Sequence, residues 1–254
     1  MALSDTEIKK YHQDGFIVPE YSLPAETLVK IRTSYDELLA LNPEFKDYCP
    51  ALLQYNLSFL KYARDPNILD MVEQILGPDI ILWNSSFFAK PEKNGKETPW
   101  HQDGEYWPLS PLATCTVWIA IDDATKDNGC LKFMRGSHKD KMLRPHLTND
   151  NQNFTLHQQI RDSEYDDDKA IYLELKAGQM SLHDVYLVHG SEANLSSKPR
   201  RGMTMRFMPG TTVFDRVKAK KLHKDLGVLD HSDRTIFLMR GEDKTGENDF
   251  RIRH

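Results

Sequence analysis

Two histidines, one aspartate and one arginine stand at spacings that suit metal-dependent oxidation chemistry. His101 and Asp103 are two residues apart, so on an extended strand their side chains point to the same face. The distant His189 completes a set of two imidazoles and one carboxylate, which can hold one face of an octahedral Fe(II) and leave three positions open. Arg200 follows at the predicted start of the next strand, and its planar guanidinium suits the carboxylate of an organic co-substrate. The H-x-D pair alone is a weak signal, but the four residues together predict an iron centre.

Other histidines and arginines compete for these roles. His183 precedes His189 by six residues and is a rival metal ligand, because it can also face a barrel interior. Arg201 competes with Arg200, although strand alternation should point it the other way, and Arg206 is a less favoured inward candidate. Four further histidines lie in polar helical or tail contexts and are expected to be solvated: His12, His223, His231 and His254.

Neighbouring strands supply candidate pocket residues. Thr116 and Trp118 share one face of an apolar strand after the H-x-D motif, and we expect them to line the pocket. Trp118 fits the barrel core equally well. Lys90 and Asn84 are evenly spaced on the strand before His101, and one or both can reach the co-substrate or the substrate.

The elements that must hold these residues are predicted by capping, periodicity and turn signals. A capping box from Ser4 to Glu7 opens a helix that ends near Asp14–Gly15, and further helices are predicted over 24–41 and 66–76. From Ile80 onward the residue pattern is typical of short strands separated by turns. The predicted strands cover 80–90, 113–121, 130–134, 170–175, 179–183, 186–190 and 202–208. This order indicates a mainly β protein with flanking helices around a double-stranded β-helix, the jelly-roll or cupin-like core.

We expect residues 1–254 to form one domain, with N-terminal helices over about 4–76, the jelly-roll core over about 79–209 and a C-terminal segment over 210–254. The polar stretch 139–168 lacks clear periodicity and is predicted to be a lid or partly disordered. Three scattered cysteines suit a reducing compartment, and Cys115 and Cys130 are expected in the core. A formal net charge of −5 and the lack of a long apolar run argue against nucleic-acid and membrane partners. A cytoplasmic monomer or homodimer is expected.

Six motifs occur in one order along the chain: Trp100–Gly104, Asp127–Leu131, Arg135–His138, Gly178–His183, Val188–Asn194 and Pro199–Arg200. In this order and spacing the chain resembles the phytanoyl-CoA dioxygenase family of Fe(II)/2-oxoglutarate oxygenases, over roughly Phe16 to Pro209. Two positions depart from the family pattern. Arg135 stands where the family usually has proline, and Asp184 stands where many bacterial members have a second histidine.

The resemblance implies a cofactor, a co-substrate and O2. Fe(II) would be held by His101, Asp103 and His189, and 2-oxoglutarate would chelate it while its far carboxylate meets Arg200 and Ser191. His183 would lie near the metal without binding it. Where a related enzyme has Ala or Gly in place of the aspartate, halogenation becomes possible, so the aspartate here favours hydroxylation or another oxidation.

The substrate is expected to be a small polar molecule. The candidate substrate contacts are Glu105, Tyr106, Arg135 and His183. Glu105 suits a substrate that carries an amine, whereas Arg135 suits an anionic substrate. The leading hypothesis is an Fe(II)- and 2-oxoglutarate-dependent hydroxylase that releases succinate and CO2. The sequence does not separate hydroxylation from desaturation, epoxidation or cyclisation at the same centre. A non-catalytic jelly-roll that binds a ligand is the alternative from another class.

Overall fold

The structure is a computed structural model that describes residues 2–253 of the chain. The helices are α1 (Asp5–Asp14), α2 (Ala25–Leu41), α3 (Leu52–Tyr55), α4 (Leu60–Ala63), α5 (Pro66–Leu76) and α6 (Arg216–Leu226). The strands are β1 (Phe16–Ile17), β2 (Tyr48–Cys49), β3 (Ile80–Lys90), β4 (Thr98–His101), β5 (Leu109–Ser110), β6 (Cys115–Ala120), β7 (Leu131–Phe133), β8 (His146–Thr148), β9 (Gln158–Ile160), β10 (Ile171–Leu173), β11 (Met180–Asp184), β12 (His189–Ser191), β13 (Arg200–Pro209), β14 (Val213–Phe214) and β15 (Phe237–Arg240).

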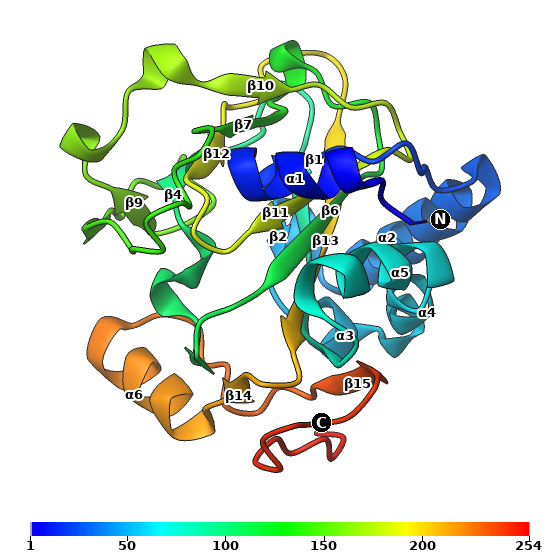
Figure 1. Ribbon diagram of the computed structural model, residues 1–254. Coiled ribbons are helices and arrows are strands. Elements are labelled where there is room, and N and C mark those ends of the chain that lie inside the picture. The colour runs from blue at the N-terminus through cyan, green and yellow to red at the C-terminus, as the bar shows by residue number, and fades with distance from the viewer. Residues whose placement is uncertain (1, 254) are drawn as a thin grey trace.

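Two antiparallel sheets form the core, as the jelly-roll prediction required. The large sheet runs β1-β11-β6-β13-β3-β15, with β2 added to β3, and the small sheet runs β10-β7-β12-β4. Helices α2 to α5 lie together beside the large sheet, and α6 stands apart near β14 (Figure 1). The predicted jelly-roll with flanking helices is confirmed.

Strand alternation decides what each face of the large sheet presents. On β13, Met203, Met205 and Phe207 belong to the apolar cluster that packs on the helices. The alternate residues of the same strand, Thr204 and Arg206 among them, line a cavity between the two sheets. A period of two therefore directs apolar side chains to the helices and polar side chains to the interior.

The helix boundaries follow the capping chemistry. Ser4 and Glu7 form the reciprocal capping box, and α1 ends at Gly15, whose φ of 87° is left-handed. Asp65 caps α5 by accepting from the backbone N–H groups of Asn67 and Ile68. The short helices α3 and α4 were not predicted, because a single turn carries too little periodicity to be recognised.

The sequence prediction was wrong about the strand that carries the H-x-D motif. β4 ends at His101, and Asp103 begins a 3₁₀ turn over Asp103–Tyr106. Gln102 between them keeps an extended backbone, with φ −115° and ψ 130°. The side chains therefore keep alternating between the two faces as far as Asp103, although the hydrogen-bonded strand ends at His101. The strand predicted over 186–190 is also displaced, since β12 covers His189–Ser191.

The polar segment 139–168 contains a hairpin of β8 and β9 and two 3₁₀ turns. Ile160 anchors it, being fully buried in a cluster with Trp100, Met134 and Val188. No helix within residues 2–253 is long and apolar enough to cross a membrane. All three cysteines are buried and free.

Gln102 ties this hairpin segment to the strand β4. Its side-chain Nε2 donates to the carbonyl of Met142 at 2.9 Å, and its Oε1 accepts from the backbone N–H of Arg144 at 2.7 Å. Its backbone N–H donates to Nε2 of His146 at 3.1 Å. One buried glutamine therefore fixes the backbone at the start of the segment.

The first prediction concerns Gln102→Leu. Leaving the partly buried backbone groups of Met142 and Arg144 without their side-chain partner should cost about 1 kcal/mol locally. We expect faster amide hydrogen exchange across 142–160, measured by mass spectrometry, with little change in the large sheet. Gln152→Leu is the matched control, because that exposed glutamine bonds only to the carbonyl of Asp150. Equal exchange in the two variants would show that Gln102 does not hold the segment.

The second prediction concerns close packing between β13 and β6. A β-carbon on Gly202 would lie 2.1 Å from Cζ2 of Trp118. Gly202→Ala should therefore lower the free energy of unfolding by about 1–3 kcal/mol, through overpacking. Adding Trp118→Phe removes the clashing ring and should recover part of that loss in denaturant titrations. Strictly additive losses in the double variant would mean that the two residues do not meet.

Candidate metal centre

Three buried side chains bring their ligand atoms together between the two sheets. His101 from β4, Asp103 from the following turn and His189 from β12 each offer one ligand atom, all within 4.8 Å of one another. Nε2 of His101 lies 3.7 Å from Oδ1 of Asp103, and Nε2 of His189 lies 4.0 Å from the same oxygen. Residues 101 and 189 face each other in the β4–β12 ladder, which explains why residues far apart in sequence converge.

Backbone carbonyls orient both imidazoles. Nδ1 of His101 contacts the carbonyl of Pro99 at 2.9 Å, and Nδ1 of His189 contacts that of Leu187 at 2.9 Å. A carbonyl only accepts, so each Nδ1 carries the proton and each Nε2 keeps a free lone pair directed at the carboxylate. Burial, followed by the nearby His101, lowers the pKa of His189 well below its usual value. An oriented histidine pair beside a carboxylate fits a divalent metal ion.

Asp103 lies in a cage of polar groups. Its Oδ2 accepts from the hydroxyl of Thr116 at 3.3 Å, and its Oδ1 lies 3.6 Å from the guanidinium of Arg206. Burial alone would raise the pKa of Asp103, but the Arg206 cation and the neighbouring imidazoles of His101 and His183 bring this pKa well below its usual value. The carboxylate is therefore ionised and ready to act as a ligand.

His183 lies beside the triad. Its Nε2 is 3.8 Å from Oδ2 of Asp103, the oxygen that does not contact the two triad imidazoles, and its Nδ1 has no hydrogen-bond partner. Its ring lies 5.1 Å from that of His189. The geometry places it against the outer carboxylate oxygen and outside the three-residue set.

Arg200 stands at the far end of the same cavity with an unusual set of partners. It is 1% exposed, and it donates to the carbonyls of Gly129 and Phe88 and to the hydroxyl of Ser191. Within residues 2–253 it forms no ion pair with a carboxylate. Burial lowers its pKa to about 10, so it still carries its charge at neutral pH. A buried cation without a carboxylate is costly, and a bound carboxylate would relieve that cost.

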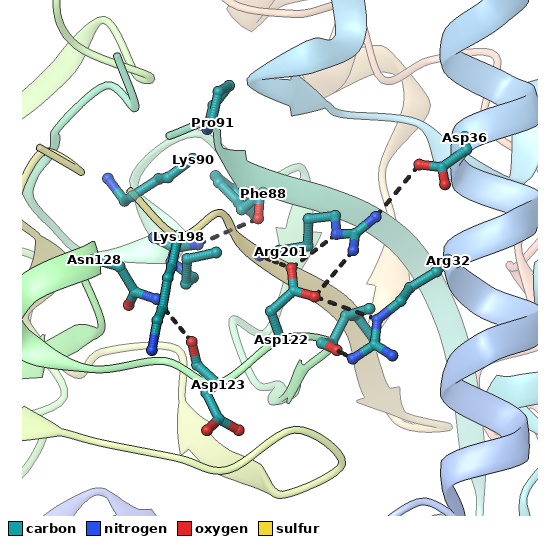
Figure 2. Close-up of polar contacts among 12 residues, drawn as sticks. Arg32, Asp36, Phe88, Lys90, Pro91, Asp122, Asp123, Asn128, Lys198 and Arg201 are labelled. Carbon is teal, nitrogen blue, oxygen red and sulfur yellow. Dashed lines mark hydrogen bonds and ion pairs between the residues drawn. The ribbon is translucent and has the colours of Figure 1, made fainter. Parts of the chain in front are cut away.

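Arg201 points to the opposite side of β13, as strand alternation predicted. It pairs with Asp122 at 2.8 Å and with Asp36 of α2, and Arg32 of the same helix also reaches Asp122 (Figure 2). This arginine joins the sheet to the helices and lies outside the cavity.

Lys90 is deeply buried close to Arg200, its partner in the β3–β13 ladder. Its ammonium group donates to the carbonyl of Lys96, and burial, followed by repulsion from Arg200, lowers its pKa well below the usual value. Figure 2 shows it on the opposite side of the strand from Arg201. It does not line the cavity, whereas Thr116 and Trp118 do. The Trp118 ring lies 5.5 Å from the Arg200 guanidinium carbon.

A second, wider cavity of about 560 Å³ opens from the triad towards the hairpin and the C-terminal segment. Tyr106, a candidate substrate contact, lines it. Glu105 is half-buried, and its carboxylate lies 3.6 Å from His146. Arg135 is exposed and lies 3.6 Å from Asp14, so the structure brings it to neither cavity.

Sequence reasoning missed Gln102 and His231 as cavity residues and undervalued Arg206. Gln102 was overlooked as the middle residue of the H-x-D motif, and Arg206 was given little weight. His231 was expected to be solvated, but it is 9% exposed and lines the wider cavity. No sequence pattern predicts the burial of His231, because this residue lies in an irregular segment after α6. His12 and His223 are exposed as expected, and His254 lies outside the described residues.

Known proteins share this sequence and this fold. A family model described as phytanoyl-CoA dioxygenase matches residues 11–202. A phytanoyl-CoA dioxygenase domain-containing protein 1 homolog from Dictyostelium discoideum is 30% identical over 162 residues, covering 63% of this chain and 58% of that protein. The human peroxisomal phytanoyl-CoA dioxygenase is 27% identical over 229 residues, covering 78% of this chain and 66% of that protein. The chain thus spans between 58% and 66% of the length of these two relatives.

Among solved structures, the apo form of the non-heme monooxygenase ThoJ superposes with a TM-score of 0.73 at 23% identity, covering 97% of this chain and 87% of that one. This likeness supports the fold. The family model covers most of the chain, and the three metal-ligating side chains meet in space. The chain belongs to the phytanoyl-CoA dioxygenase family, within the iron- and 2-oxoglutarate-dependent oxygenases, and carries their HxD…H triad in His101, Asp103 and His189.

Proposed function

We propose that this chain is an Fe(II)- and 2-oxoglutarate-dependent dioxygenase that hydroxylates a small polar molecule and releases succinate and CO2. The observation that carries the proposal is the pairing of two features in one cavity: a three-ligand metal triad, and the buried Arg200, which has no carboxylate partner among the described residues. A dicarboxylate that binds the metal at one end and Arg200 at the other would satisfy both features.

His101, Asp103 and His189 would hold the metal, and three ligands leave room for a bidentate co-substrate and for O2. Bound iron would activate O2, with one oxygen atom entering succinate as 2-oxoglutarate loses CO2 and the other entering the hydroxylated product. The protein residues supply binding and orientation. Arg200 and Ser191 would bind the far carboxylate, with Ser191 already in contact with the guanidinium at 3.3 Å.

The remaining pocket residues would orient the co-substrate and exclude water. Trp118 and Leu131 give the cavity apolar surface beside Arg200, which strengthens charge pairing there. Thr116 would hold the Asp103 carboxylate through its hydroxyl. Lys90 would act indirectly, since it lies close to Arg200 and does not line the cavity.

The wider cavity would take the substrate, and the hairpin segment 139–168 would cover it. Thr148, Asp150 and His157 line this cavity from the hairpin side. A polar cover over a metal site limits access of water during reaction. We further propose that residues 1–254 work as one domain, as a monomer or homodimer, in the cytoplasm.

The third prediction tests the co-substrate site. Arg200→Ala should raise the Michaelis constant for 2-oxoglutarate by a factor corresponding to about 2–5 kcal/mol, because the bound carboxylate loses a buried charge partner. The measurement is succinate formed at varied 2-oxoglutarate with Fe(II), ascorbate and O2 present.

Arg201→Ala is the matched control on the same strand. It should lower thermal stability, because Asp36 loses its partner and Asp122 keeps only Arg32, and leave the Michaelis constant within about twofold. A larger rise for Arg201→Ala than for Arg200→Ala would contradict the assignment.

A further inference from the structure

We propose that Arg206 and His231 form an anchor for a carboxylate on the substrate, so that the proposed oxygenase acts on a small organic acid with an apolar body. This inference rests on the proposed function and adds a substrate class to it. Both residues line the cavity of about 560 Å³ that also contains His101 and Asp103. An anchored acid would therefore lie next to the metal triad.

Arg206 is a buried cation whose bonding capacity is only partly used. It is 4% exposed, and one of its terminal nitrogens donates to the hydroxyls of Ser86 and Thr204 at 2.9 and 3.0 Å. Its Nε has no hydrogen-bond partner. The other terminal nitrogen approaches Asp103 at 3.6 Å, too far for a good hydrogen bond. Asp103 is also a metal ligand, so it compensates this cation only in part.

His231 presents a hydrogen-bond donor to the same cavity. Nε of Arg234 donates to Nδ1 of His231, so this Nδ1 is the acceptor. Burial, followed by repulsion from Arg234 and Arg206, lowers the pKa of His231 well below its usual value and keeps the ring neutral. A neutral ring that accepts at Nδ1 carries its proton at Nε2. No hydrogen bond of that Nε2 is recorded within residues 2–253, which leaves its N–H to a ligand.

The charge balance of the cavity favours an anion. Arg234 is 8% exposed, and it donates to Asn84, His231 and the carbonyl of Pro50 without any carboxylate among the described residues. Two guanidinium groups are therefore buried here, Arg206 lining the cavity and Arg234 against His231, and the charge of a bound metal would be offset by the 2-oxoglutarate dianion. The only other carboxylate lining the cavity is Asp150, whose side chain is 86% exposed. An incoming carboxylate would supply the missing negative charge.

Apolar side chains around the anchor indicate the rest of the ligand. The Arg206 guanidinium carbon lies 5.1 Å from the Trp107 ring and 5.8 Å from the Phe88 ring. Val228 and Leu229 line the cavity from the segment after α6. One full charge and one neutral donor suit a monoanionic carboxylate better than a dianionic phosphate group. An aromatic or aliphatic carbon skeleton fits the remaining surface.

This wall is built partly from chain outside the family match. The match covers residues 11–202, whereas Arg206 and the segment carrying His231 and Arg234 follow it. The triad and Arg200 fall within the match.

The test compares each acid with its own amide. The Ni(II)-loaded protein, saturated with 2-oxoglutarate, is titrated calorimetrically with 3-phenylpropanoate, hexanoate, their primary amides and 2-phenylethylphosphonate. We expect both acids to bind the wild-type protein at least about tenfold more tightly than their amides, since the amide lacks the charge. The phosphonate should bind no more tightly than the acids.

Arg206→Gln should reduce acid binding roughly 10- to 100-fold and remove the preference over the amide, while Arg206→Lys keeps part of it. His231→Gln should cause a smaller loss. Arg135→Gln is the control for removing a positive charge, because Arg135 is exposed and lines neither cavity. It should leave acid binding unchanged.

Several results would overturn the proposal. Amides that bind as tightly as the acids, or no acid binding by a protein that binds 2-oxoglutarate, would remove the anchor. Tighter phosphonate binding would contradict the carboxylate assignment. If Arg206→Gln weakens Ni(II) or 2-oxoglutarate binding and spares the acid preference, Arg206 serves Asp103 instead. Failure of the wild-type protein to bind 2-oxoglutarate would count against the proposed function itself.

Discussion

A buried carboxylate sets the main constraint on this structure. Asp103 is 8% exposed, and an ionised group at that depth needs compensating charge and hydrogen bonds. Arg206 lies 3.6 Å from it, and the surrounding imidazoles of His101 and His189 are turned by backbone carbonyls so that their lone pairs face it. A metal cation would complete that arrangement. Because the ligand side chains are already oriented, little further ordering of the protein would be needed to bind it.

The two sheets divide the work of holding the centre. The small sheet carries both triad histidines, on the paired strands β4 and β12. The large sheet carries Arg200 and Arg206 on the inner face of β13, while the alternate residues of that strand bind the sheet to the helices. The same alternation therefore serves stability on one side and chemistry on the other. The substrate cavity is closed by less regular parts, the hairpin segment and the chain after α6.

The triad and the inward direction of Arg200 could be predicted from the sequence, because strand periodicity and motif spacing are local patterns that the folded strands keep. The inward and outward directions of Arg200 and Arg201 follow from alternation alone. The setting of Asp103 in a 3₁₀ turn could not be predicted, since one extended residue, Gln102, preserves the direction after the strand has ended. The burial of His231 could not be predicted for another reason. Its burial and tautomer depend on Arg234 and on packing of the C-terminal segment against the cavity, which leave no local pattern.

The most direct measurement is anaerobic absorption spectroscopy of the apoprotein titrated first with Fe(II) and then with 2-oxoglutarate. We expect one Fe(II) per chain and a metal-to-ligand charge-transfer band that appears only when both are present. His189→Ala should abolish the band, and His183→Ala should retain it, because only the first residue belongs to the three-ligand set. Absence of the band in the wild-type protein, or its loss in His183→Ala with retention in His189→Ala, would contradict an iron centre held by His101, Asp103 and His189.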